Sequence, residues 1–226
     1  MSDEAPDKTA LHEVLYNLDG QLKLRRPTGP TTPTMNYVLI ESTYEGDAAR
    51  FGNLQNYDDR FELRKGIPLT GRIPSDAAYR MRDDYPDNIE LHESLYNLDR
   101  QLVVNEKVKA FLDAEGIQHV EYLPMKVLNH KGREVKERYF IINMLPLVDC
   151  IDLEQTQYER NPLAPKKLME VSNLTVIEEK IPADFQLFRM DQVQSAILIR
   201  RSLAEKLKAA GFRGFNIAEL SEFDAA

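Results

Sequence analysis

One apolar tract constrains the fold more than any other feature of this chain. It runs from Arg138 to Gln157, RYFIINMLPLVDCIDLEQTQ, and is too short and too interrupted by polar residues to span a membrane. Its β-branched and aromatic residues favour extended structure over Tyr139–Ile142 and, after a turn at Pro146, over Val148–Leu153. Because apolar residues occupy successive positions, both faces of each strand must be covered. The tract therefore predicts two neighbouring buried strands with other elements packed over them.

Composition restricts the classes of partner. The 226 residues allow one large domain or two small ones, and 29 Lys+Arg against 37 Asp+Glu give a net charge of -8. This balance argues against nucleic acid or an anionic membrane as the main partner and suits a basic protein. Cys150 is the only cysteine, which excludes an intramolecular disulfide and a thiolate metal cluster within one chain. The acidic start, MSDEAPDKTA, has no signal-peptide pattern, so we expect a cytoplasmic protein.

The chain contains an internal repeat. The segment LHEVLYNLDGQL at 11–22 recurs 80 residues later as LHESLYNLDRQL at 91–102, with ten of twelve positions identical. Its leucines recur at helical spacing and predict an amphipathic helix. Identity extends to the polar positions, which helical periodicity does not require, so the segment was copied. The two differences are Val14 against Ser94 and Gly20 against Arg100.

The first copy lies in a predicted extension. A stretch with three prolines and one glycine, 25–34, follows it and predicts a flexible linker. We therefore divide the chain into an N-terminal extension, 1–34, and a folded domain, 35–226. Two interpretations of the extension stay open. It is either a passive product of duplication or of an over-long gene start, or a segment able to occupy the groove made for the second copy. The latter would allow a homo-oligomer through 11–22 and 91–102.

The domain begins with a strand-forming run, Met35–Ile40, and Arg60–Leu63 alternates like a half-buried strand. A strand–helix–strand unit follows. Its features are a strand over 102–104, an N-cap at Asn105 with Glu106 in the first turn, a helix end at Gly116, and a strand over 117–122. Hairpin arms over 125–128 and 135–142 are joined by the turn 129–134.

The C-terminal part repeats this unit in form. A strand over 196–199 precedes a helix with a capping box formed by Ser202 and Glu205, and Gly211 ends the helix before a strand over 215–217. The two units align, with Gly116 opposite Gly211, Val104 opposite Ile199 and Val120 opposite Phe215. These patterns predict an α+β fold in which a mixed β-sheet and two strand–helix–strand units flank a central apolar hairpin, with some parallel pairing.

No catalytic, cofactor-binding or metal-binding residue is predicted. The sequence has no Walker loop, dinucleotide-binding glycine motif or nucleophile elbow, and its four histidines lack metal-ligand spacing. We expect the repeated histidines on the surface and His130 at a turn. The histidines are His12, His92, His119 and His130.

One polar cluster interrupts the apolar tract, consisting of Asp149, Cys150 and Asp152. A carboxylate beside a thiol could form a nucleophile–base pair, but that chemistry also needs a histidine nearby in space. The alternative is that the acids accept backbone N–H bonds at a strand end while Cys150 fills the core. The acid pairs 58–59, 83–84 and 178–179 are expected to be solvated loop charges, or an acidic face for a basic partner.

Four stretches resemble a known family. They are MNYVL at 35–39, VEYLP and LNHKG within 120–132, YFIIN followed by VDCID within 139–152, and LFR through GFRGF within 187–215. They are similar to the eleventh immunity-protein family of bacterial polymorphic toxin systems, formerly a domain of unknown function. The resemblance covers about 35–226 and implies an α+β protein encoded beside a toxin and protecting its producer. Such toxins are often nucleases delivered by contact-dependent or type VI secretion systems. No catalytic residue can be carried over from the family.

We therefore predict an immunity protein that is not an enzyme and uses no cofactor. It would neutralise a cognate toxin, expected to be basic, by direct complex formation through residues that the sequence does not identify. Two alternatives stay open. One is an enzyme that reverses toxin damage or hydrolyses a small molecule with Asp149 and Cys150. The other is a self-associating structural protein.

Overall fold

The computed structural model describes residues 15–16, 22–23, 35–160, 162–163 and 168–225, and the chain divides into two compact units, Met1–Thr34 and Met35–Ala226. In the first unit, strands β1 (Leu15–Tyr16) and β2 (Leu22–Lys23) pair antiparallel, with Leu15 opposite Lys23. The helix predicted over 11–22 is therefore wrong at the three described residues within it, Leu15, Tyr16 and Leu22. The rest of that prediction lies outside the described residues.

The second unit contains a mixed sheet with the strand order β4-β6-β7-β5. Helix α1 joins β5 to β6, and both strands pair antiparallel with β7, which lies between them. The strand–helix–strand unit is thus split by a third strand. Strand β4 pairs with β6 in parallel. The bounds are β4 (Ala78–Arg80), β5 (Val103–Asn105), α1 (Glu106–Ala114), β6 (Val120–Leu128) and β7 (Tyr139–Met144).

A second four-stranded sheet has the order β10-β11-β3-β12 and repeats this arrangement. Helix α2 joins β11 to β12, and both strands pair antiparallel with β3 between them. The two predicted strand–helix–strand units and the α+β class are confirmed. The predicted presence of some parallel pairing is confirmed by β4 and β6, although the two strands of each unit do not pair with each other, because β7 or β3 lies between them. The bounds are β3 (Tyr37–Ser42), β10 (Leu187–Arg189), β11 (Ile197–Arg200), α2 (Arg201–Ala209) and β12 (Phe215–Ala218).

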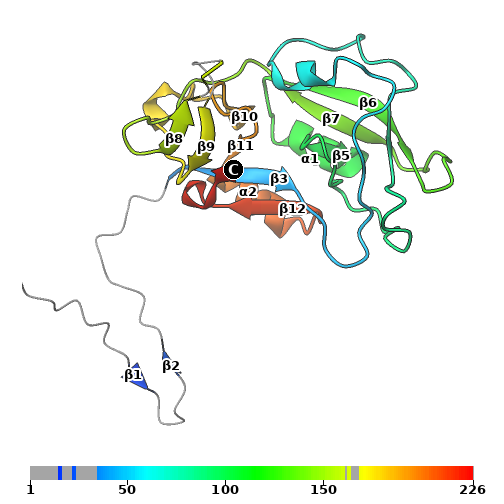
Figure 1. Ribbon diagram of the computed structural model, residues 1–226, viewed down its shortest axis with the longest axis horizontal. Coiled ribbons are helices and arrows are strands. Elements are labelled where there is room, and N and C mark those ends of the chain that lie inside the picture. The colour runs from blue at the N-terminus through cyan, green and yellow to red at the C-terminus, as the bar shows by residue number, and fades with distance from the viewer. Residues whose placement is uncertain (1–14, 17–21, 24–34, 161, 164–167, 226) are drawn as a thin grey trace, which may run out of the picture. The chain divides into compact units, whose positions relative to one another are not determined.

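Smaller elements complete the second unit (Figure 1). Strands β8 (Gln157–Arg160), β9 (Leu168–Ser172) and β13 (Asp224–Ala225) form a three-stranded sheet with β9 in the middle. Three 3₁₀ helices are η1 (Arg60–Arg64), η2 (Glu178–Lys180) and η3 (Leu220–Glu222). The strand predicted over 60–63 is therefore wrong. The chain turns there, with the Glu62 N–H donating to the Asp59 carbonyl.

The helix ends follow from local chemistry at three of four predicted positions. The Asn105 side chain accepts hydrogen bonds from the Lys107 and Val108 N–H groups at 3.2 Å, so it caps α1 as expected. Gly116 and Gly211 follow the two helices with φ of +69° and +74°, a conformation in which glycine avoids a steric cost. The capping box predicted at Ser202 is wrong. Helix α2 begins two residues earlier than a cap at Ser202 requires, and the side chain of its actual N-cap, Arg200, makes no capping hydrogen bond.

The two helices share one apolar core. Val108 and Leu112 of α1 and Leu203 and Leu207 of α2 are buried in the same hydrophobic cluster, together with residues of β3, β5, β7 and β11. This core therefore joins the two split units. The opposite face of the β7 sheet packs in a second hydrophobic cluster, and the opposite face of the β3 sheet packs in part in a third.

The apolar tract contributes to three hydrophobic clusters, two of them through β7 and the third through its second half. All six residues of β7 are buried, as predicted for the first half of the tract. After the cis Leu145–Pro146 bond the chain leaves this sheet, and Val148 and Ile151 form isolated bridges with Met190 and Val176. The second predicted strand, and its place beside the first, are therefore wrong. The apolar pattern correctly predicted that both halves of the tract are buried, but it did not predict which segments they pair with.

Candidate functional site

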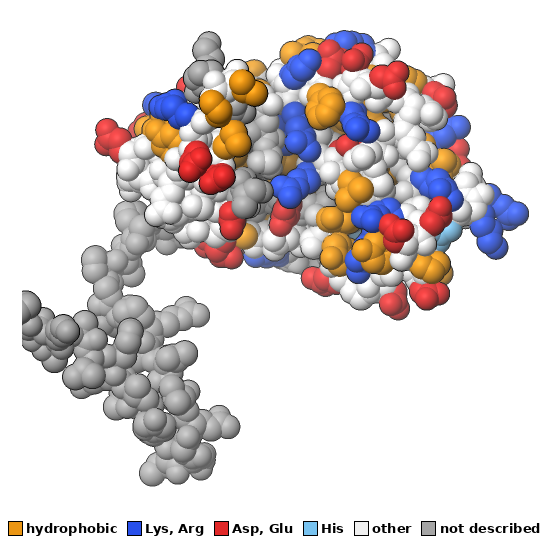
Figure 2. All heavy atoms as spheres, in the orientation of Figure 1, with side chains coloured by type: hydrophobic (Ala, Val, Ile, Leu, Met, Phe, Trp, Pro, Cys, Tyr) orange, Lys and Arg blue, Asp and Glu red, His pale blue; other side chains and the backbone are white. Residues whose placement is uncertain are grey.

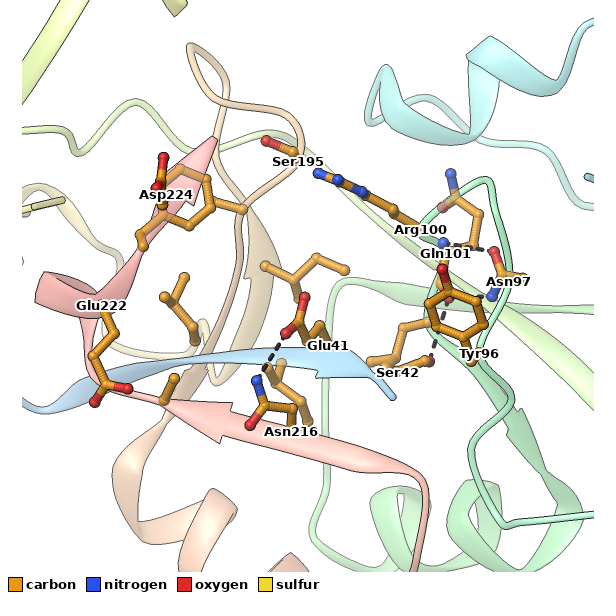
Figure 3. Close-up of a pocket in the computed structure, with 17 residues that line it drawn as sticks. Glu41, Ser42, Tyr96, Asn97, Arg100, Gln101, Ser195, Asn216, Glu222 and Asp224 are labelled. Atoms are coloured by element: carbon orange, nitrogen blue, oxygen red, sulfur yellow. Dashed lines mark hydrogen bonds between the residues drawn. The ribbon is translucent and has the colours of Figure 1, made fainter. Parts of the chain in front are cut away.

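A groove with a volume of about 380 Å³ opens on the exposed face of the sheet that contains β3. Its floor is formed by β3 and β12, one wall by the turn 96–102, and the opposite wall by residues 222–224 (Figure 3). Residues 195–197 complete the lining. Segments far apart in the sequence therefore meet around one hollow.

The alternation along β3 decides what the floor presents. Val38 and Ile40 point into the helical core, so Glu41 lies on the other face and is exposed. Its carboxylate accepts a hydrogen bond from the Asn216 side chain at 2.8 Å. Polar groups of β3 and β12 thus line this part of the sheet face.

The groove carries both signs of charge. Glu41, Glu222 and Asp224 are exposed carboxylates on the floor and one wall, and Arg100 extends from the other wall toward Ser195 (Figure 3). Among the residues that the structure describes, Arg100 is the only Lys or Arg that lines the groove. Figure 2 likewise shows side chains of both signs mixed over one face of the protein. Such a surface favours a partner that offers a matching pattern of charges.

The groove wall that carries Arg100 is formed by the second copy of the repeat, 91–102. The helix predicted for 91–102 is wrong, because this segment is an irregular turn with isolated bridges. Five of its polar side chains are buried, and Leu98 is 43% exposed. His92, predicted on the surface, is 4% exposed and is therefore also corrected. The buried polar residues are His92, Ser94, Asn97, Asp99 and Gln101.

Asn97 closes this turn by itself. Its amide nitrogen donates to the Leu95 and Gln101 carbonyls at 3.0 and 2.8 Å, and its oxygen accepts from the Gln101 N–H at 3.0 Å. These local bonds offer the backbone an alternative to a helix.

Asp99 anchors the turn to the domain. Its carboxylate accepts hydrogen bonds from the Leu54 N–H at 2.5 Å and the Tyr79 hydroxyl at 3.2 Å, and Arg60 Nε lies 3.8 Å away. Burial and the nearby Asp99 charge raise the pKa of Tyr79 well above its ordinary value, so the phenol remains a donor. Removing Asp99 would leave two buried donors without their acceptor.

A buried cation supports the same wall from behind. Arg189 is 2% exposed and donates to the Gln194 carbonyl and, at 3.1 Å, to the Gln101 side-chain oxygen. Burial, together with the nearby Arg64 charge, lowers the pKa of Arg189 to about 9. The groove wall is therefore held by a charge-assisted contact from β10 to the repeat.

The structure separates the residues of the predicted Asp–Cys cluster. Cys150 is fully buried, and burial with the neighbouring Asp149 charge raises the pKa of its thiol to about 12. Asp149 is exposed and accepts a hydrogen bond from Gln192, while Asp152 accepts the Glu154 and Gln155 N–H groups. Among the described residues, the charges that act on the Cys150 thiol come from Asp149 and Lys180 and not from a histidine. This arrangement matches the structural interpretation and lacks an activated nucleophile.

The other two described histidines lie in different places. His119 Nε2 lies 2.6 Å from an Asp184 carboxylate oxygen, and its ring stacks on Phe185. His130 lies in the turn of the β6–β7 hairpin, as predicted. His12 lies outside the described residues. These histidines form no common site.

The predicted acid pairs differ in their environments. The carboxylates at 58–59 and 83–84 are exposed, and the latter pair with Arg80 and Arg82. Glu178 instead binds the backbone and side-chain nitrogens of Asn36. Only the first two pairs are therefore solvated loop charges of the expected kind.

No group of three or more His, Cys, Asp or Glu side chains among the described residues is placed to hold a metal ion. In the same part of the chain, no helix has the length and apolar character needed to cross a bilayer.

The model of the Immunity protein family (Imm11) matches residues 36–222, which is most of the chain. The chain belongs to the Imm11 family. The family resemblance drawn from four sequence stretches is confirmed. A comparison with curated proteins found no match.

Sequence reasoning did not identify the groove of this Imm11 protein. One signal pointed to it, because the repeat is identical at polar positions such as Asn97, Asp99 and Gln101. Those positions are buried and hydrogen-bonded in the second copy. Glu41, Glu222 and Asp224 carry no motif, and only the fold brings them together.

Proposed function

We propose that this Imm11 protein protects its producer by binding one cognate toxin directly in the cytoplasm, without a reaction of its own. The family match over 36–222 carries the proposal, because it spans nearly all of the second compact unit. We further propose a basic toxin, with a nuclease effector of a type VI or contact-dependent system as the class to test first.

The groove is the surface that we propose for toxin contact. Its three carboxylates could pair with cationic side chains of the toxin, and Arg100 could pair with an acidic one. A stable complex buries about 1,600 Å² in total, so the toxin would also cover the rims of the groove. The net charge of -8 would speed encounter with a basic partner, and the association rate would fall as salt rises.

Charge reversal in the groove tests this surface. The product of the neighbouring gene would be co-purified with the wild-type chain and with Glu41→Lys and Asp224→Lys variants. Glu134→Lys, in the exposed β6–β7 hairpin, is the matched control. We expect at least roughly tenfold weaker binding for the groove variants and little change for the control. Equal affinities for all three variants would exclude the groove as the contact surface.

The enzymatic alternative is separated by substitutions at the former candidate residues. Asp149→Asn and Cys150→Ala should leave protection intact if neutralisation needs only binding. Loss of protection by a variant that still folds and still binds the toxin would support catalysis instead. The buried thiol with a raised pKa favours the binding proposal.

A further inference from the structure

The two copies of the repeat share more than sequence. In the second copy, Ser94 bridges Val104 antiparallel and the Leu95 N–H donates to the Val103 carbonyl at 3.0 Å. In the first copy, Leu15 pairs with Lys23. Shifting Leu15 and Lys23 by 80 residues gives Leu95 and Val103, so the described strands of the first copy have the register of the second.

The contacts that hold 91–102 depend almost entirely on residues that the first copy repeats. Asp99 binds Leu54 and Tyr79, Asn97 closes the turn, and Gln101 receives Arg189. Leu95 and Leu102 fill the adjoining cores. The residues of the second copy that make these contacts, together with buried His92, are all identical in the first copy. Their counterparts are His12, Leu15, Asn17, Asp19, Gln21 and Leu22.

The two positions that differ between the copies have opposite effects on how well the first copy fits the site of the second. Val14 in place of Ser94 weakens the fit, and Gly20 in place of Arg100 improves it. Ser94 Oγ lies 2.7 Å from Ser42 Oγ, and Val14 could not make this hydrogen bond. Arg100 has a φ of +51°, a left-handed conformation that is unfavourable for a residue with a side chain. Gly20 would adopt it without that steric cost. The first copy is therefore a close competitor for the site of the second.

We propose that segment 11–22 of one chain occupies the site of segment 91–102 in a second copy of this chain. The incoming segment takes over the hydrogen bonds that Asp99, Asn97 and Gln101 make in the resident one, and the resident segment is displaced as a loop. This proposal does not depend on the toxin or on the proposed function.

Exchange would change the groove. Arg100 is the one cation among the described residues that line the groove, and the incoming segment carries Gly20 at that position. The exchanged groove would keep Glu41, Glu222 and Asp224 and lose its positive charge. An exchanged pair would thus present a more acidic surface than a single chain.

A disulfide trap between full-length chains tests the exchange. One chain carries Ser42→Cys and the other, with an affinity tag, carries Val14→Cys, the position equivalent to Ser94. A bond between Cys side chains at these positions must join two molecules. The native Cys150 is fully buried. After mild oxidation with oxidised glutathione, we expect a tagged, covalent heterodimer at several times the control yield.

Two controls define the expected geometry. A Ser42→Cys/Ser94→Cys double variant should form the bond within one chain, since the two hydroxyl oxygens lie 2.7 Å apart. A mixture of Ser42→Cys with Glu13→Cys chains is the off-register control. In the resident copy the equivalent Glu93 instead accepts a hydrogen bond from Arg213. A Val14→Cys yield no higher than the Glu13→Cys yield would overturn the proposal.

Two changes in the receiving chain, added to Ser42→Cys, test the mechanism. Asp99→Asn weakens the anchor of the resident segment and should raise the heterodimer yield severalfold. Arg100→Gly relaxes the resident turn and should lower it. Yields that respond to neither change would show that the cross-link does not report exchange, and the proposal would fail.

Discussion

Gly214 provides the sharpest test of how the groove wall is joined to the sheet. It precedes β12 with a φ of +86°, and a Cβ atom there would lie 2.1 Å from the Ser94 carbonyl oxygen and 3.0 Å from His92 Cβ. The Ser94 N–H also donates to the Arg213 carbonyl at 3.0 Å. An alanine at position 214 must therefore push the repeat away from the C-terminal sheet.

The magnitude follows from two separable costs. A positive φ costs alanine about 1 kcal/mol relative to glycine. Moving the Ser94 backbone would also break its bond to Arg213 and the Thr43 N–H bond to the Gly214 carbonyl, at about 1 kcal/mol each or more when buried groups stay unpaired. We expect Gly214→Ala to lower the free energy of unfolding by about 3–5 kcal/mol.

Gly132→Ala is the matched control, because Gly132 has a φ of +70° but no atom within 4 Å of its added Cβ. It should cost only about 1 kcal/mol. Urea unfolding, analysed at equal m-values, measures both variants. If Gly214→Ala costs no more than Gly132→Ala, the close approach of the repeat to Gly214 is not what holds the wall.

Three further predictions concern the rest of the domain. Burial acts to raise the pKa of Glu121, but hydrogen bonds from residues 69–70 and Asn143 outweigh burial and hold the pKa below its ordinary value of 4.5. The stability that these bonds contribute is present above pH 4.5 and is lost as the pH falls through the lowered pKa. Glu121→Gln should therefore flatten the loss of stability in acid as the pH falls below the ordinary pKa of a glutamate, and an unchanged slope there would refute this. Asn105→Ala should cost about 1–2 kcal/mol in urea unfolding by removing the α1 cap, whereas a cost under about 0.3 kcal/mol would contradict that role. Cys150 should react with a thiol reagent orders of magnitude more slowly in the folded protein than in urea, and rapid native labelling would disprove its burial.

The elements that the sequence predicted best are those fixed by short-range chemistry. Asn105 caps its helix through bonds to residues two and three positions on, and Gly116 and Gly211 stop helices by their own backbone freedom. The two helices and the flanking strands were therefore predictable. The strand inserted between each parallel pair was not, because pairing partners come from distant segments.

Long-range contacts explain the failures. The leucines of 91–102 have helical spacing, yet Leu98 is exposed while Asp99 is turned inward to Leu54 and Tyr79. Apolar periodicity cannot reveal that buried polar contacts decide the conformation. The groove could not be predicted from the sequence for the same reason, because Glu41 and Asp224 line one hollow only after β3 and residues 222–224 have folded together.

We propose that this Imm11 protein protects its producer by forming a stable complex with the toxin and not by turning over a substrate. Stoichiometry tests it most directly. Toxin activity would be titrated with the purified full-length chain while native mass spectrometry counts the complexes. We predict that activity falls in proportion to complex formed and disappears at one chain per toxin. Complete protection at a small fraction of that ratio, with no complex observed, would contradict the claim.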